Sequence, residues 1–364
     1  MKYLIFLLFF WLLWALPAFS AEYVSSSLKE KDIAWFDAAK DPFRVYGVFV
    51  PDREQPYYYR VPEYVGKKIS PVFSMLAHHT AGGRVRFATD SPYIAVHAEE
   101  WEGIPRTNLT LTFSNGFDVY SGKNYAGTIM PPEISYDGFD GILYLGEGHR
   151  AVTLNLPRYA GLKTLYIGLK KGSRLERAQD YKTEKPLVFY GSSITQGECA
   201  SRPGNTYEDI ISRNLDADYI NLGFSGNAFG EQAVCDYIAG LDMTAFILDY
   251  DHNAPDPEFL KNTHYNVYKT VRRAHRDLPI ILVSRPNPVI TEDVRARFDI
   301  INQTYKRAKN EGDKNVYIVP GYEFMKGFGS DCWTVDNVHP NDLGMVLMAK
   351  RLQGVLKPIV KGDK

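Results

Sequence analysis

A serine near the middle of the chain and a histidine near its end stand in settings that suit nucleophilic catalysis. The stretch VFYGSSITQG, residues 188–197, is an apolar strand that stops abruptly at small hydroxyl residues, among them Ser193. The stretch TVDNVHPNDLG places Asp336 three residues before His339. A serine nucleophile needs a base to take its proton, and the base needs an acceptor that fixes its tautomer. These residues therefore predict a Ser193-His339-Asp336 triad for acyl transfer.

Two further loops offer donors for an oxyanion hole. GFSGNAFG, residues 223–230, carries Gly226, and DYDHNAP, residues 249–255, carries the side-chain amide of Asn253. With the backbone at Ser193 they would stabilise the charge that develops on a carbonyl oxygen. Each feature also has a structural reading, because serines after strands cap helices and glycines form turns. The order serine, glycine, asparagine and Asp/His after separate strands favours a catalytic site.

The second half of the chain has the rhythm of a buried parallel sheet. Continuous apolar strands are predicted at 187–190, 219–223, 245–250, 279–284 and 316–321. Helices are predicted at 206–215, 257–277 and 292–312. Such alternation predicts a three-layer α/β/α domain with a flavodoxin-like parallel sheet, whose site lies beyond the carboxyl ends of the strands.

The first half instead shows short strands with period two. They are predicted at 84–87, 93–98, 109–113, 142–145, 152–156 and 165–169. Asn115-Gly116 is predicted to form a two-residue hairpin turn. This half is therefore predicted to be an all-β, jelly-roll-like sandwich. We divide the chain into a signal peptide at 1–20, the sandwich at 21–178 and the α/β domain at 179–364.

The N-terminus and the charge balance indicate an exported protein with neutral partners. The apolar run from Tyr3 to Leu16 is shorter than the ~20 residues of a membrane span, and small residues precede Ala21 as in signal peptides. We predict a periplasmic or secreted protein with no membrane span after cleavage. With 42 basic and 43 acidic residues among 364, no nucleic-acid partner is predicted.

The three cysteines, Cys199, Cys235 and Cys332, allow at most one bridge within the chain. Buried free thiols are favoured, and a Cys199–Cys332 pair is the alternative because both flank the predicted site. The chain has no His-Glu-x-x-His zinc signature. No metal and no cofactor are predicted.

The order of these blocks resembles that of the SGNH, or GDSL-like, hydrolases. The resemblance implies that Ser193 is the nucleophile and that Gly226 and Asn253 are oxyanion donors. It also implies that Asp336 and His339 are the acid and the base of the triad. YGSSITQGECASRPGNTY, NLGFSGNA and VDNVHPNDLG are most similar to a subgroup with a β-sandwich in front, whose Gly-x-Asp-Leu-Tyr signature resembles GFDVY at 116–120. The resemblance covers roughly residues 40–356.

The sequence departs from the family pattern at three places. Ser192 stands where the wider superfamily has Asp, and the subgroup resembles this chain in having Ser there. The third block reads Asp251-His252-Asn253-Ala254 where Gly-x-Asn-Asp is usual, and Val119 replaces Leu in the signature.

Export, the leading sandwich and the resemblance together imply a carbohydrate acetyl esterase acting outside the cytoplasm, with acetylated carbohydrate or another small ester as substrate. The alternatives are a lipase or phospholipid esterase of the same superfamily, and a non-catalytic glycan-binding protein. Trp333 is either a platform for substrate or a core residue. Arg202 either approaches the pocket or pairs with a surface carboxylate.

Overall fold

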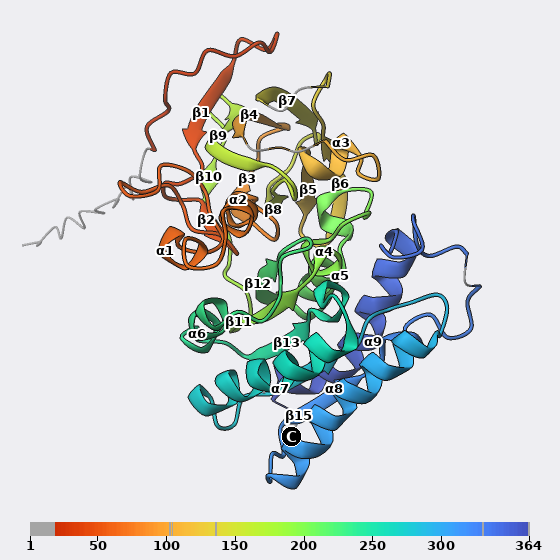
Figure 1. The fold of residues 1–364 in the computed structure, drawn as a ribbon. Helices are drawn as coiled ribbons and strands as arrows, with labels where there is room; N and C mark the ends of the chain where they lie inside the picture. Colours follow the sequence, from red (N-terminus) through yellow and green to blue (C-terminus); the bar gives the residue numbers. More distant parts are fainter. Residues whose placement is uncertain (1–18, 102, 104, 135–136, 330, 363–364) are drawn as a thin grey trace, which may run out of the picture.

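An antiparallel β-rich domain is followed by a parallel α/β domain (Figure 1). The computed structural model describes residues 19–101, 103, 105–134, 137–329 and 331–362. The strands are β1 (Ile33–Asp37), β2 (Arg44–Tyr46), β3 (Arg84–Thr89), β4 (Tyr93–Trp101), β5 (Phe117–Ser121), β6 (Asn124–Ile129), β7 (Gly138–Tyr144), β8 (Arg150–Asn155), β9 (Gly161–Lys170), β10 (Leu175–Glu176), β11 (Thr183–Gly191), β12 (Ala217–Gly223), β13 (Ala245–Asp249), β14 (Ile280–Val283) and β15 (Val316–Val319). The helices are α1 (Glu63–Gly66), α2 (Pro71–His78), α3 (Leu111–Ser114), α4 (Ser193–Gln196), α5 (Tyr207–Leu215), α6 (Gln232–Ala239), α7 (Pro257–Ala274), α8 (Glu292–Asn310) and α9 (Asp342–Lys361).

The first domain is a sandwich of two antiparallel sheets. One sheet has the order β1-β9-β4-β7, and the other has β10-β3-β8-β5-β6 with β2 beside β3. Alternate residues point inward, as Ile94 and Val96 do on β4 and Leu165 and Ile167 do on β9, and they share one core. The prediction of an all-β sandwich is confirmed.

The predicted strand at 109–113 is wrong. Residues 111–114 form the single-turn helix α3, because Thr110 Oγ1 accepts the N–H of Phe113 at 3.2 Å and caps the turn. The predicted hairpin at Asn115-Gly116 is therefore wrong as well, since Asn115 closes this helical turn onto the carbonyl of Leu111. The two-residue turn lies further along, between the paired residues Ser121 and Asn124.

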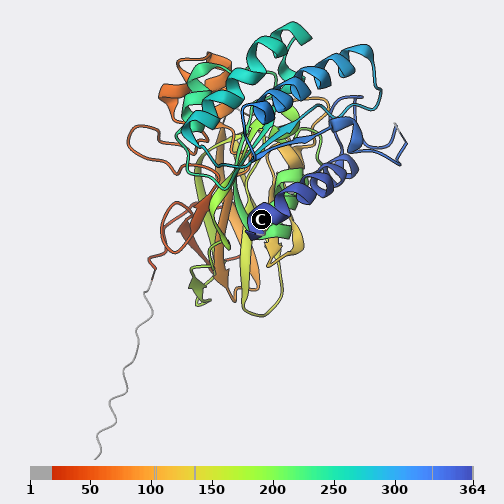
Figure 2. The ribbon, with the colours of Figure 1, turned by 90° about the horizontal axis from the view of Figure 1, so that it is seen from below.

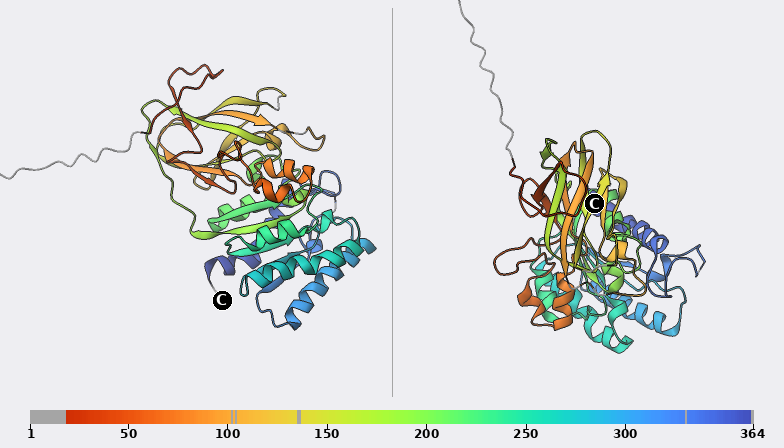
Figure 3. Two further views of the ribbon diagram at one scale, coloured as in Figure 1. Left: turned by 60° about the vertical axis from the view of Figure 1, so that its left-hand side comes forward. Right: turned by 90° about the horizontal axis from the view of Figure 1, so that it is seen from above.

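Helices α1 and α2, which the period-two pattern does not predict, belong to the core of the second domain. Their residues Val65, Phe73 and Leu76 are buried in the same cluster as the apolar residues of β11–β14. The ring of Phe73 stacks on that of Phe224 at a centroid distance of 4.1 Å. In Figures 1 and 3 helices α1 and α2 lie at the boundary of the two domains, beside α6. The first half of the chain thus helps to build the second domain.

The second domain is the predicted three-layer sandwich. Its five-stranded sheet has the order β12-β11-β13-β14-β15, and all neighbouring strands are parallel. Val188 and Tyr190 pack toward α6, α7 and α8, whereas Leu187 and Phe189 pack toward α5 and α9. Figure 2 shows α7 and α8 together on one side of the sheet and α9 on the other.

The strand order reverses at β11, and ligands of such sheets bind beyond the carboxyl ends of the strands at the reversal. Two glycines allow the chain to turn tightly there. A Cβ on Gly191 would lie 2.3 Å from the carbonyl oxygen of Asp249, and a Cβ on Gly223 would lie 2.1 Å from the backbone nitrogen of Gln196. The loops after β11, β12 and β13 are therefore packed backbone against backbone.

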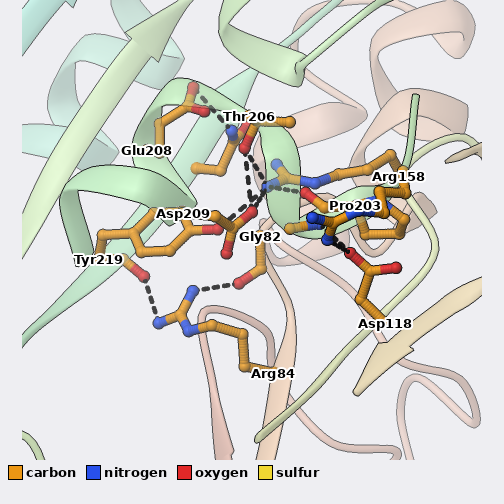
Figure 4. Close-up of polar contacts among 12 residues, drawn as sticks. Gly82, Arg84, Asp118, Arg158, Pro203, Thr206, Glu208, Asp209 and Tyr219 are labelled. Carbon is orange, nitrogen blue, oxygen red and sulfur yellow. Dashed lines mark hydrogen bonds and ion pairs between the residues drawn. The ribbon is translucent and has the colours of Figure 1, made fainter. Parts of the chain in front are cut away.

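Buried arginines fasten the two domains to each other (Figure 4). Arg158, which follows β8, donates to Asp209, to Thr206 Oγ1 at 2.5 Å and to the Tyr219 hydroxyl at 3.1 Å. Arg84 of β3 donates to the carbonyl oxygen of Tyr219 at 3.0 Å. Because both guanidinium groups are about 1% exposed, these bonds fix the sandwich against α5 and β12.

Candidate active site

Ser193 is the first residue of α4, and Ser192 alone separates it from the end of β11. Ser192 Oγ accepts the N–H of Ile194 at 3.2 Å and caps this short helix. Capping, the alternative role for these hydroxyl residues, is therefore filled by Ser192. The side chain of Ser193 is left for another partner.

That partner is His339. Ser193 Oγ lies 2.8 Å from His339 Nε2, and His339 Nδ1 lies 2.7 Å from Asp336 Oδ2. Asp336 Oδ1 also accepts the N–H groups of His339 at 2.8 Å and of Val338 at 3.2 Å. Burial alone raises the pKa of Asp336, but these hydrogen bonds outweigh it and hold that pKa below its ordinary value. The three side chains have the distances that serine, base and acceptor need.

The loop that carries Asp336 and His339 is closed at its base and tied to the last helix. An isolated antiparallel bridge joins Thr334 to Pro340. Asn341 Oδ1 accepts the N–H of Leu343 at 3.0 Å and caps α9. The loop that this bridge closes therefore presents the imidazole of His339 toward α4.

The candidate oxyanion donors lie on the loops that follow β12 and β13. Gly226 has φ +67°, which a glycine adopts without strain, and a Cβ there would meet open space. Asn253 Nδ2 donates to the carbonyl oxygen of Phe224 at 2.8 Å, so the two loops are joined. The N–H of Ser193 heads α4, where helical N–H groups have no partner within the helix.

Two arginines hold the third block. The Asp251 carboxylate accepts the N–H of Arg285 at 2.9 Å and Arg297 Nη1 at 3.3 Å. Arg297 Nη1 also donates to the carbonyl oxygen of Ala254 at 3.0 Å. The aspartate that replaces the family's glycine is thus 1% exposed and ion-paired. It fixes the short turn that presents Asn253.

Sequence analysis missed two polar residues at the site. Glu198, 3% exposed, places Oε1 3.7 Å from His339 Nε2. Asn108, from the first domain, donates from Nδ2 to Glu198 Oε1 at 2.8 Å and to Asp336 Oδ2 at 3.3 Å. The position of Glu198 five residues after Ser193 was a usable signal. Nothing local to Asn108 in the sequence points to a site more than eighty residues away.

The two predicted substrate-binding residues are both engaged in contacts within the protein. Arg202 Nη1 donates to Asp118 Oδ2 at 2.6 Å and to the Tyr120 hydroxyl at 2.8 Å, so it pairs with a buried carboxylate of the first domain. Trp333 is 1% exposed and belongs to the core that α9 covers. Of the two alternatives for Trp333, this burial supports the core residue.

All three cysteines are free thiols, and Cys199 and Cys332 form no bridge. Cys332 is exposed, although buried thiols were expected for all three. Cys199 lies with Asp336 and His339 in a group whose ligand atoms are within 4.8 Å of one another. Because Asp336 and His339 are already hydrogen-bonded to each other, this group serves the triad, and the absence of a metal stays a prediction.

Two families match the two halves of the chain. The GDSL-like lipase/acylhydrolase family matches residues 184–357. The N-terminal domain of SGNH-type esterases, with its Gly-x-Asp-Leu-Tyr signature, matches residues 33–175. The second domain thus belongs to the GDSL-like lipase/acylhydrolase family, and the first matches the domain that precedes SGNH-type esterases.

Solved structures share the fold of the whole chain. A protein from Bacteroides ovatus ATCC 8483, described as a GDSL-like lipase, is 29% identical with a TM-score of 0.80, over 90% of this chain and 98% of that one. The salicylyl-acyltransferase SsfX3 of a tetracycline biosynthetic pathway is 18% identical with a TM-score of 0.75, over 91% and 98%. A family two carbohydrate esterase from Clostridium thermocellum, in complex with cellohexaose, is 16% identical with a TM-score of 0.58, over 76% and 92%. No curated protein sequence matches the chain.

The structure bears on the membrane in one respect. Within residues 19–362, apart from the few undescribed positions, no helix of the protein is long and apolar enough to cross a bilayer. The predicted signal peptide at 1–20 lies almost wholly outside the described residues.

Proposed function

We propose that the protein removes acetyl groups from carbohydrates, outside the cytoplasm, through an acyl-enzyme on Ser193. The observation that carries the proposal is the unbroken line from Ser193 Oγ to His339 Nε2 at 2.8 Å and from Nδ1 to Asp336 Oδ2 at 2.7 Å. A carbohydrate substrate is supported by the structural similarity to a family two carbohydrate esterase that was solved in complex with cellohexaose.

In the proposed reaction Ser193 Oγ attacks the ester carbonyl carbon while its proton passes to His339 Nε2. The carbonyl electron pair moves to the oxygen, where the N–H groups of Ser193 and Gly226 and the amide of Asn253 stabilise it. His339 then gives its proton to the sugar oxygen, which leaves as the alcohol. Water, deprotonated by the same imidazole, releases acetate and restores Ser193.

One observation favours a second candidate, an esterase for longer acyl chains. Ile290, Phe328, Val335 and Val338 are all at least 36% exposed and lie on loops after β14 and β15, at the edge of the sheet that carries Ser193. Ile290 and Phe328 also line a cavity of about 350 Å³. Apolar side chains at that edge would suit an acyl chain as well as a sugar.

The experiment that tests the proposal measures hydrolysis of p-nitrophenyl acetate, butyrate and octanoate by the wild-type protein and Ser193→Ala. We expect the acetate to give the highest kcat/KM and the alanine variant to lose turnover of all three. Release of acetate from acetylated xylan then tests the carbohydrate. Turnover that survives in Ser193→Ala would remove the proposed nucleophile, and preference for octanoate would replace the first candidate by the second.

A further inference from the structure

The active site contains a second carboxylate close to the imidazole, in addition to that of Asp336. Glu198 Oε1 lies 3.7 Å from His339 Nε2, the nitrogen that faces Ser193 Oγ at 2.8 Å. The side chain of Glu198 is 3% exposed and that of His339 is 16% exposed. A distance of 3.7 Å is too long for a hydrogen bond but short for the attraction of two full charges.

Hydrogen bonds hold Glu198 in place. Asn108 Nδ2 donates to Oε1 at 2.8 Å, the Tyr159 hydroxyl donates to Oε2 at 2.7 Å, and Ser225 Oγ donates to Oε2 at 3.1 Å. Arg106 Nη1 approaches Oε2 at 3.5 Å. Burial by itself raises the pKa of Glu198, but the charge of His339 and these donors outweigh it and lower that pKa. The carboxylate is thus anionic and fixed beside the ring.

We propose that Glu198 is a positioning residue that acts through His339, by stabilising the imidazolium that forms at each proton transfer. The proposal rests on the proposed esterase function. When Ser193 Oγ bonds to the ester carbon, its proton passes to Nε2 and the ring becomes a cation. That cation lies close to two carboxylates, Asp336 at Nδ1 and Glu198 near Nε2.

Among the described residues, the ion pairs of His339 are those with these two carboxylates. Burial raises the pKa of the Cys199 thiol to about 12, so it is neutral at ordinary pH. Burial lowers the pKa of His252, on the turn after β13, to about 3, so that ring is neutral as well. Arg106 is the nearby cation, and it faces Glu198. Its charge weakens the attraction of Glu198 for the imidazolium without removing it.

The first domain supports both carboxylates, which gives it a part in catalysis. Asn108 donates to Glu198 Oε1 and, at 3.3 Å, to Asp336 Oδ2, and Tyr159 also comes from the sandwich. The loop around Asn108 is attached to the second domain nearby, since Thr110 Oγ1 donates to the carbonyl oxygen of Ser201 at 3.0 Å. Asn108, a residue of the first domain, therefore joins the side chains of Asp336 and Glu198, which belong to the second domain.

The test is the pH dependence of kcat/KM for p-nitrophenyl acetate in Glu198→Gln, which keeps the size of the side chain and removes its charge. An anion near the imidazole favours the protonated ring, so its loss should move the acidic limb of the profile about one unit to lower pH. The plateau value should fall about tenfold, because a shift of one unit corresponds to a tenfold change in equilibrium.

Glu100→Gln is the control for replacing a buried glutamate by glutamine, since Glu100 is also 3% exposed but lies in the sandwich, bonded to Asn115. Its profile should overlay the wild type. Glu198→Asp keeps the charge but moves it one methylene away from the imidazole. It should shift the acidic limb of the kcat/KM profile in the same direction, by a smaller amount. This variant replaces Glu198→Gln in the test if Glu198→Gln does not fold. An acidic limb that stays in place in these variants, with or without a loss of rate, overturns the proposal. Loss of the proposed function would show separately, as activity that survives in Ser193→Ala.

Discussion

Asp118 Oδ2 accepts a hydrogen bond from Arg202 Nη1 at 2.6 Å, so the signature aspartate of the first domain holds the loop that follows the nucleophile. The same oxygen accepts the N–H of Gly204 at 2.8 Å, and Thr128 Oγ1 donates to Oδ1 at 2.7 Å. The guanidinium of Arg202 also lies 3.9 Å from the centroid of the Tyr125 ring. The signature residue Asp118 therefore connects the first domain to the second by hydrogen bonds.

Asp118→Ala should destabilise the protein by about 3 kcal/mol, the low end of the cost of breaking a buried ion pair. The low end applies because the Arg202 side chain keeps 18% of its exposure, whereas Asp118 has none. Urea unfolding measures the change. Arg202→Leu and the double variant complete a cycle, and single costs that simply add would contradict a direct coupling of the pair.

Ser193→Ala and His339→Ala should each lower kcat by about 10⁴-fold or more, and the double variant should lower it no further. The reason is that the hydroxyl is reactive only while the imidazole accepts its proton, so either loss removes the whole step. Steady-state kinetics on p-nitrophenyl acetate measures all three. A double variant much slower than both single variants would show that the two residues act independently.

Asn253→Ala should lower kcat by about 10²–10³-fold, the usual cost of one oxyanion donor, with a smaller effect on KM. Part of the loss can come from the bond between Asn253 Nδ2 and the carbonyl oxygen of Phe224, which positions the loop. Asn262→Ala is the matched control because Asn262 is exposed on α7 and bonds to Glu258. Unchanged kcat in Asn253→Ala would exclude that residue as a donor.

Much of the second domain could be predicted from the sequence, because its strands are continuous apolar runs and its chemistry follows those strands. Once Ser193, Gly226 and His339 are assigned to the carboxyl edge of one parallel sheet, their proximity follows from topology. The helix at 111–114 could not be predicted in the same way. LTLTF has the alternation of a strand, and the cap from Thr110 outweighs that preference over one turn.

The contributions of one domain to the other were also beyond the sequence. Asn108 and Tyr159 act on Glu198 across 90 and 39 positions of the chain, and no local pattern records such contacts. Trp333 shows the opposite limit. A large aromatic residue near a candidate catalytic histidine suits a substrate platform or a core equally well, and only its burial to 1% decides.

The buried carboxyl group of Asp249 predicts that the free energy of unfolding falls as the pH rises. Asp249 is 3% exposed, and burial raises its pKa to about 8, although the Tyr207 hydroxyl donates to Oδ2 at 3.1 Å. In the unfolded chain the same group has its ordinary value of 3.8. Between these values the folded protein keeps the proton and the unfolded chain does not, so the free energy of unfolding decreases toward higher pH.

Asp249→Asn should remove this part of the pH dependence, because the amide resembles the neutral carboxyl and cannot ionise. Relative to wild type, the variant should gain stability between pH 5 and pH 8, by at most about 4 kcal/mol at 1.36 kcal/mol per unit. Urea unfolding at both pH values measures the difference. The variant should retain some decline of its own toward higher pH, since burial also raises the pKa of Glu100 and of Glu208 to about 8. A difference between variant and wild type that is the same at pH 5 and pH 8 would show that Asp249 is ionised in the folded protein.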